Sequence, residues 1–170
     1  MRNGCSKSNE GAASRVRVMT RGGPVTATFR EASSADLEAL LGLYALLEFE
    51  PAQSLSLEAA RVRFERYREY PNYWIYVAEV DEAIVGTFAL IIVDSVAHSG
   101  KPFAVVEDVV VSQDWQGRGI GKLMMEFAML RCKEFGCYKL ALSSHLKRQK
   151  AHSFYESLGF EKHGFSFFIT

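Results

Sequence analysis

This 170-residue sequence has few cysteines, no long apolar run and no excess of charge of either sign. Its three cysteines, Cys5, Cys132 and Cys137, lack C-x-x-C spacing, which argues against a disulfide framework or a zinc site and suits a reducing compartment such as the cytoplasm. Twenty basic and twenty acidic residues give a formal net charge of zero, so nothing global favours nucleic acid or a membrane surface as a partner. No stretch approaches the roughly 18 apolar residues of a membrane span.

The first 24 residues differ from the rest of the chain. They carry five basic residues against one acidic residue, and too few large apolar side chains to offset the entropy lost on ordering. They also lack the apolar region of a secretory signal. The sequence therefore predicts a disordered basic leader over residues 1–24 and a single domain over residues 25–170, which is long enough to bury its own core.

Apolar periodicity and turn residues divide the predicted domain into strands and helices. Ser33 and Asp36 stand at capping-box spacing before an amphipathic helix, and Pro51 and Pro71 follow the first two helices. The predicted helices cover residues 37–47, 57–70, 120–135 and 149–158. The predicted strands cover residues 25–30, 73–80, 83–93, 105–111 and 139–143, with one or two more within 161–170.

The stretch from Val105 to Phe135 organises the rest of the chain. A β-branched strand leads into Gln116–Gly121, which has three glycines, and then into a long helix. Alternating glycines let a ligand approach the backbone, and the first N–H groups of the helix lack intrahelical partners. This arrangement suits a phosphate, although a plain tight turn would also use such glycines. The G-x-G-x-G spacing excludes the dinucleotide fingerprint, and Leu123 after Lys122 excludes a P-loop.

Two signatures resemble those of the GNAT superfamily of N-acetyltransferases. Gln116, Gly119 and Gly121 match its acetyl-CoA-binding pattern, Gln/Arg-x-x-Gly-x-Gly/Ala, and residues 151–160 match its late helix with Phe-Tyr-x-x-Leu-Gly-Phe. The resemblance implies an α/β (α+β) GNAT fold, in which a mixed, twisted sheet of six to seven strands is flanked by about four helices. It also implies acetyl transfer from acetyl-CoA to a primary amine. For the assembly we predict a possible homodimer. No cysteine has the setting of an activated nucleophile, so we expect direct attack in a ternary complex.

The resemblance also implies which residues bind acetyl-CoA. The strand residues would offer backbone groups to the pantetheine arm, beside a bulge that splays the strand from its neighbour. The turn residues would hold the phosphates. Tyr155 would be the general acid toward the departing thiolate, where the alternative is an ordinary core aromatic. The residues so assigned to acetyl-CoA are Val109, Val110, Val111, Gln116, Gly117, Arg118, Gly119, Ile120 and Gly121.

Glu107 and Asp108 are acidic residues inside an otherwise apolar strand. Adjacent residues of a regular strand point to opposite faces, so we expect the two carboxylates to have different roles. We assign Glu107 as the general base, since burial would raise its pKa toward a useful range, and Asp108 to acceptor binding. The alternative is that one of them pairs with a basic side chain or with the backbone.

A basic cluster, Lys147-Arg148-Gln149-Lys150, precedes the last helix. Arg148 stands where many family members have Asn, and we assign it to acetyl-CoA and Lys147 to an anionic acceptor, against the alternative of a solvated helix start.

Partial resemblances within the superfamily bear on the acceptor. Residues 106–111 and 137–139 resemble glucosamine-6-phosphate N-acetyltransferases, whereas residues 142–144 and 151–152 resemble aminoalkylphosphonate N-acetyltransferases. We therefore predict a small primary amine with an anionic group as the acceptor. A protein or peptide N-acetyltransferase, and a CoA-binding module without catalysis, are the alternatives.

Overall fold

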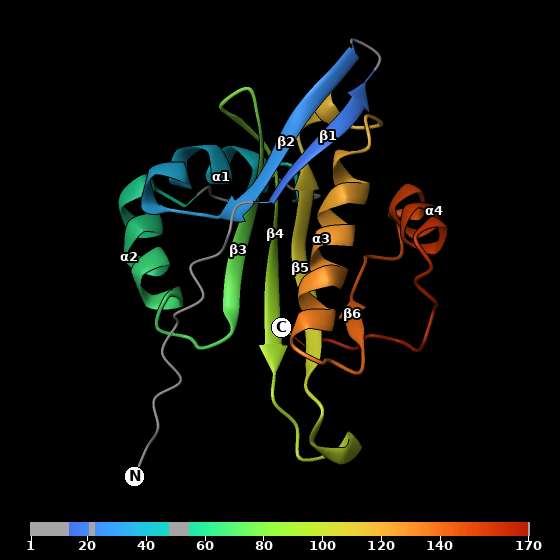
Figure 1. Cartoon of the computed structure of the whole chain (residues 1–170). Coiled ribbons are helices and arrows are strands. Elements are labelled where there is room, and N and C mark those ends of the chain that lie inside the picture. Colours follow the sequence, from blue (N-terminus) through green and yellow to red (C-terminus); the bar gives the residue numbers. More distant parts are fainter. Residues whose placement is uncertain (1–13, 21–22, 48–54, 170) are drawn as a thin grey trace.

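A single mixed sheet forms the centre of the computed structural model, which describes residues 14–20, 23–47 and 55–169 (Figure 1). The strands lie in chain order, and every neighbouring pair is antiparallel except β5 and β6, which are parallel. The prediction of a mixed sheet of six to seven strands flanked by about four helices is confirmed, with six strands and four α-helices among the described residues. The strands are β1 (Ser14–Thr20), β2 (Gly23–Glu31), β3 (Tyr73–Val80), β4 (Ala83–Val93), β5 (Phe103–Val111) and β6 (Leu140–Leu142). The α-helices are α1 (Leu37–Tyr44), α2 (Leu57–Tyr67), α3 (Ile120–Glu134) and α4 (Gln149–Ser157).

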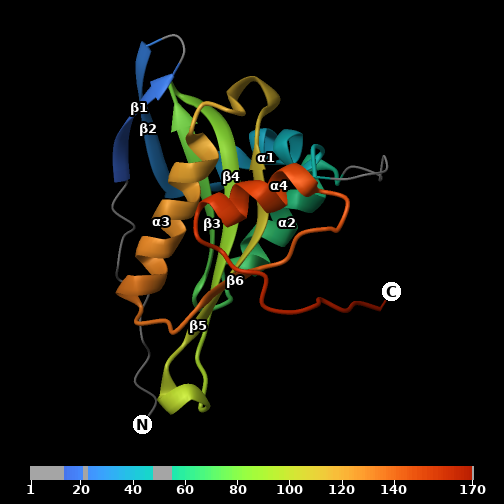
Figure 2. The ribbon, with the colours of Figure 1, turned by 90° about the vertical axis from the view of Figure 1, so that its right-hand side faces the viewer.

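Helices cover both faces of the sheet (Figure 2). The helix α3 lies on one face and α1 and α2 lie on the other, while α4 lies beside the edge formed by β6. A hydrophobic core lies on each face of the sheet, and alternate residues of β3 contribute to each. Tyr76 and Ala78 face the core under α3, whereas Ile75 and Val77 face the core under α1 and α2. The strand β5 contacts α3 on one face and α1 on the other. Its last residues, which have no partner on the β6 side among the described residues, lie near α4 (Figure 2).

The sheet begins earlier than the sequence predicted. Residues 14–20, placed in the disordered leader, form β1 and pair with β2 from Ser14 opposite Phe29 to Thr20 opposite Gly23. The alternation Arg15-Val16-Arg17-Val18 has the period of a strand, and Val16 packs against the main core. For these residues the leader prediction, which rested on charge and composition, is wrong. Residues 1–13 lie outside the described part of the chain.

The end of the chain also differs from the prediction. Residues 161–169 form neither helix nor strand, so the strands predicted within 161–170 are wrong for the described residues. The segment runs away from the sheet, and its backbone therefore has no neighbouring strand with which to pair (Figure 2). Four large apolar side chains in it are 89–98% exposed: Phe165, Phe167, Phe168 and Ile169.

Two observations on the described residues concern membranes and metal ions. Among the helices in this part of the chain, none combines the length and apolar character that crossing a bilayer requires. The same residues contain no cluster of three or more His, Cys, Asp or Glu side chains able to hold a metal ion.

Candidate active site

A β-bulge in the middle of β5 shapes the site. In the pairing with β4, Val110 lies opposite Thr87 but Glu107 lies opposite Ala89, so β5 carries one extra residue between these pairs. Asp108 takes up the irregularity with φ at 54°, a left-handed conformation that Asp tolerates better than most residues. The bulge that the family resemblance implied in this strand is confirmed.

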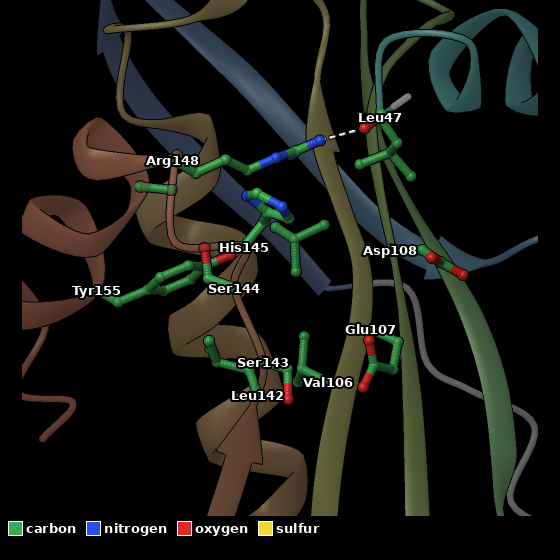
Figure 3. Close-up of a pocket in the computed structure, with 12 residues that line it drawn as sticks. Leu47, Val106, Glu107, Asp108, Leu142, Ser143, Ser144, His145, Arg148 and Tyr155 are labelled. Carbon is green, nitrogen blue, oxygen red and sulfur yellow. Dashed lines mark hydrogen bonds between the residues drawn. The ribbon is translucent and has the colours of Figure 1, made fainter. Parts of the chain in front are cut away.

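The bulge breaks the regular alternation from which opposite faces were predicted for Glu107 and Asp108. Both residues line one cavity of about 270 Å³, and the Asp108 side chain points away from Tyr155 and α4 (Figure 3). The cavity lies where β6 stops pairing with β5, since β6 pairs only with residues 104–106. Its lining comes from the turn after α1, from β5, from the end of β6, from the β6–α4 loop and from α4: Leu47, Val106, Glu107, Asp108, Val109, Leu142, Ser143, Ser144, His145, Arg148, Ala151 and Tyr155.

The two carboxyl groups are held in an environment that disfavours their charge. Burial raises the pKa of Glu107, and the neighbouring charge of Asp108 raises it further. Asp108 is the more exposed of the two, yet desolvation by the surrounding protein raises its pKa as well. A carboxylate with a raised pKa is a stronger base than a solvated one, which is the property that proton abstraction from an ammonium group requires.

Tyr155 faces the cavity from α4. Its ring lies between Phe154, with ring centroids 5.1 Å apart, and Phe160, at 5.8 Å. Burial raises the pKa of its phenol, with a smaller opposing effect from the positive charge of Arg148 and a reinforcing one from Glu107. The phenol is therefore protonated at neutral pH and can donate a hydrogen bond or a proton into the cavity.

Arg148 crosses the cavity from the start of α4 to the turn after α1. Its guanidinium donates a hydrogen bond to the carbonyl oxygen of Leu47, shown by the dashed line in Figure 3. The loop behind it is tightly bonded: the carbonyl oxygen of His145 accepts from the backbone N–H of Arg148 at 2.9 Å and from Nε2 of His152 at 3.1 Å. Lys147, in contrast, is exposed and does not line the cavity. Of the two predicted basic ligands, Arg148 therefore lines the cavity and Lys147 does not.

The glycine-rich turn lies between β5 and α3. Gly117 and Gly119 have φ values of 70° and 88°, and Gly119 is the N-cap of α3. A Cβ on Gly121 would come within 3.4 Å of Phe154 Cζ, so this glycine allows α3 and α4 to approach each other.

Two side chains brace this turn. Gln116 donates from Nε2 to the carbonyl oxygen of Val111 at 3.0 Å, which ties the turn to the end of β5. The guanidinium of Arg118 lies 5.0 Å from the centre of the Trp115 ring. The conformation of the turn is thus fixed by its own residues.

Comparison with known proteins supports the family resemblance that was based on the turn and on α4. The model of the acetyltransferase (GNAT) family matches residues 38–160, which include β5, the turn and α4. The chain belongs to the GNAT family.

Individual relatives and structures agree with this membership. A glucosamine 6-phosphate N-acetyltransferase of Trypanosoma brucei brucei is 31% identical over 134 residues, which cover 79% of this chain and 88% of that protein. A probable glucosamine 6-phosphate N-acetyltransferase of Drosophila melanogaster is 33% identical over 100 residues, covering 58% of this chain but only 44% of that longer protein. The crystal structure of the glucosamine-6-phosphate N-acetyltransferase of Arabidopsis thaliana superposes with a TM-score of 0.74 at 26% identity, covering 85% of this chain and 97% of that one.

The residues present fit acetyl-CoA, the cosubstrate of the GNAT family. The N-terminus of α3, 15 residues long, has no acidic residue in its first turn and begins at a left-handed glycine, so a phosphate can approach its N–H groups. Beyond residue 106, β5 has no partner strand on its β6 side among the described residues, which leaves room for an extended arm. Within the Gln116–Gly121 turn, Gln116 also bonds within the chain, which gives it a bracing role. When bound, acetyl-CoA would supply the acetyl group as an activated thioester.

Several lining residues were missed at the sequence level. Ser143, Ser144 and His145 follow β6 directly, and Leu47 ends the turn after α1. The loop residues could have been found, because the end of a parallel strand beside β5 is where side chains reach a shared crevice. Leu47 carried no such signal, since its place in the cavity depends on how α1 packs over the sheet.

Proposed function

We propose that the protein transfers the acetyl group of acetyl-CoA to the primary amine of a small molecule that carries an anionic group. The proposal is carried by the cavity that Glu107, Asp108 and Tyr155 line, beside the end of β5 that has no partner strand on its β6 side among the described residues. These groups answer the three needs of the reaction: the amine loses a proton, the acceptor is held in place, and the leaving group receives a proton.

The roles follow from charge and burial. Glu107 takes the proton from the acceptor ammonium, because its pKa is raised by burial and by Asp108. Asp108 binds the ammonium through a charge-assisted hydrogen bond. Tyr155 donates to the departing thiolate, and the amine attacks the thioester directly in a ternary complex. Acetyl-CoA is held by the β5 residues Val109–Val111, by the turn Gln116–Gly121 and by Arg148.

Support for the anionic group comes from basic residues near the cavity and from the relatives. Arg148 lines the cavity, and Lys147 lies beside it in the chain, although exposed. The Trypanosoma and Drosophila relatives are both named for glucosamine 6-phosphate, an amine with a phosphate group. We accordingly expect a phosphorylated amino sugar or an aminoalkylphosphonate as the acceptor.

A panel of acceptors tests the proposal. Initial rates with acetyl-CoA are measured for glucosamine 6-phosphate, an aminoalkylphosphonate, an aminoglycoside, a polyamine and a lysine peptide, with calorimetric binding of acetyl-CoA alongside. The highest kcat/KM is expected for a phosphorus-containing amine. A preference for the lysine peptide would replace this function with protein acetylation. Acetyl-CoA binding without turnover of any amine would point to a module that binds CoA without catalysis, and absence of binding at millimolar acetyl-CoA would contradict both.

We also propose that the protein acts in the cytoplasm as a homodimer. The exposed apolar side chains of residues 165–169 support the dimer, because a second copy would remove them from water. Three phenylalanine side chains of about 150–250 Å² each, together with Ile169, would approach the area of a standard interface if both copies buried them. The scarcity of cysteine supports the cytoplasm, which fractionation of cells would test.

A further inference from the structure

The C-terminal end of α3 holds two cysteines within one hydrogen-bonded turn. Gly136, with φ at 68°, donates its N–H to the carbonyl oxygen of Lys133 at 3.0 Å. The N–H of Cys137 donates to the carbonyl oxygen of Cys132, also at 3.0 Å. These two bonds and the left-handed glycine make a Schellman motif, which folds the chain back over the last helical turn and brings the side chains at its first and last positions together. Both positions are cysteine in this chain.

The connection from α3 to β6 is held in place on both sides of the motif. The N–H of Tyr138 donates to the carbonyl oxygen of Pro102 at 2.9 Å, and the carbonyl oxygen of Lys139 accepts from the N–H of Ala104 at 2.9 Å. The thiol of Cys132 donates to the same Lys139 oxygen at 3.6 Å, a weak bond of the kind a thiol makes. The backbone that carries the two cysteines is therefore tied to β5 and to the residue before it.

The two thiols differ in their access to solvent. Cys132 is only 7% exposed and belongs to the main core, whereas Cys137 packs against that core and is half-buried. Burial raises the pKa of the Cys132 thiol to about 12, and the neighbouring Cys137 raises it further. A reagent from solution can therefore reach Cys137, whereas Cys132 can react only with a group that is already beside it.

We propose that Cys132 and Cys137 form a redox site that a small-molecule disulfide converts to an intrachain disulfide. With glutathione disulfide, the Cys137 thiolate attacks one sulfur, the S–S bond of the reagent breaks, and one glutathione leaves. Cys132 gives its proton to solvent and attacks the Cys137 sulfur of this mixed disulfide, which releases the second glutathione. Both departing thiolates take up a proton, so two protein thiols are oxidised and one glutathione disulfide is reduced.

This site is separate from the proposed acetyl-transfer site. Neither cysteine lines the cavity, which is beyond the other end of β6. Both cysteines are free thiols in the structure, as a reducing compartment requires. Disulfides that form in such a compartment are usually transient and respond to oxidation, which is the behaviour that one accessible and one buried thiol at a helix end provide.

Mass spectrometry of the full chain tests the proposal. Cys5, outside the described residues, is replaced in the parent protein by Cys5→Ser, and the folded protein is incubated with glutathione disulfide. It should lose the mass of two hydrogen atoms and retain no glutathione. Because Lys133 lies between the two cysteines, trypsin cuts between them, and peptides 132–133 and 134–139 should stay joined until dithiothreitol is added. Stable glutathione adducts, or two thiols still open to alkylation, overturn the proposal.

Single replacements in this parent test the order of the two steps. Cys132→Ala should accumulate one glutathione on Cys137, because the second thiol is missing. Cys137→Ser should react at least about ten-fold more slowly than the parent, because the buried thiol is out of reach of the reagent. Glutathione bound to Cys132 at the parental rate contradicts the assignment of Cys137 as the first thiol to react.

The same reaction in urea shows whether the fold builds the site. The ratio of glutathione disulfide to the square of the glutathione concentration that half-oxidises the protein should be about ten-fold lower for the folded chain than for the unfolded one. The reason is that the Schellman motif raises the effective concentration of one thiol at the other. Equal ratios overturn the proposal, because the pair would then react only as neighbours in sequence. This comparison uses the parent protein alone and does not depend on the folding of either variant.

Discussion

At the scale of single residues, the raised pKa of Glu107 links catalysis to stability. A base acts only when it is deprotonated, so the wild-type kcat/KM should fall as the pH drops through the raised pKa of Glu107. Glu107→Gln should remove this acidic limb and lower kcat/KM by on the order of 100-fold. A pH–rate profile measures both effects. Glu161→Gln, in the exposed C-terminal segment, controls for the loss of one negative charge, and a profile shared by all three proteins would argue against Glu107 as the base.

The same raised pKa predicts that replacing Glu107 with a neutral residue stabilises the folded protein at neutral pH. The folded state binds the Glu107 proton more tightly than the unfolded state, so its contribution to stability is present at low pH and is lost as the pH rises through the folded pKa. Glu107→Gln should therefore have a higher Tm than the wild type at neutral pH, and the difference should vanish in acid. Thermal melts across pH 4–8 would show this, and a lower Tm at every pH would contradict it.

Tyr155 gives a second prediction at this scale. Tyr155→Phe should lower kcat by on the order of 100-fold, because the departing thiolate loses its proton donor, while the Kd of acetyl-CoA changes little. The ring contacts with Phe154 and Phe160 remain in the variant, so its Tm should stay close to that of the wild type. Stopped-flow rates measure kcat, and calorimetry measures the Kd of acetyl-CoA. Equal losses in kcat and in acetyl-CoA affinity would assign Tyr155 to binding instead.

At the scale of elements, the turn before α3 depends on backbone conformations that only glycine adopts easily. Gly119→Val places a β-branched residue at φ 88°, which costs about 1–2 kcal/mol of stability and blocks the approach of a phosphate to α3. The Kd of acetyl-CoA should rise at least about ten-fold, as a lost charge-assisted bond of about 1.5 kcal/mol or more implies.

A glycine elsewhere provides the matched control. Gly42 lies inside α1 with ordinary φ, and a Cβ added there would have no other atom within 4 Å, so Gly42→Ala should stabilise the protein by about 0.5–1 kcal/mol. Its acetyl-CoA affinity should be unchanged. Chemical denaturation and calorimetry on both variants test the pair, and unaltered acetyl-CoA binding by Gly119→Val would remove the turn from the cosubstrate site.

The elements also show what the sequence could and could not predict. The strand, turn and helix from Val105 to Glu134 were predictable, because β-branched residues, alternating glycines and helical periodicity each act locally. The bulge at Asp108 was expected only through the family resemblance. The resulting break in side-chain alternation at Glu107 and Asp108 was missed, since the bulge depends on how β5 pairs with Thr87 and Ala89 across the sheet. The strand β1 was missed because its basic residues outweighed the alternation of Arg15 to Val18.

At the scale of the whole molecule, the C-terminal segment, which was predicted to form strands and does not, offers a contact for dimerisation. Removal of residues 165–170 deletes four side chains that are at least 89% exposed in a single chain, so it should change little in a monomer. If the segment joins two copies, the full chain should sediment as a dimer whose Tm rises with protein concentration. The truncated chain should then sediment as a monomer with a lower Tm that does not depend on concentration. Sedimentation of both forms tests this, and an unaltered mass would place the dimer contact elsewhere or show that the full chain is monomeric.

The stacking of Arg118 on Trp115 has a spectroscopic consequence. The sequence has two tryptophans, and the other, Trp74, packs against Phe135 at the far end of α3, with ring centroids 5.4 Å apart. Trp74→Phe would leave one indole beside the glycine turn, where it can report on ligand arrival by its emission. If phosphates draw Arg118 away from the ring, the emission of Trp115 should change in proportion to the fraction of cosubstrate bound, giving an optical titration that needs neither turnover nor an acceptor.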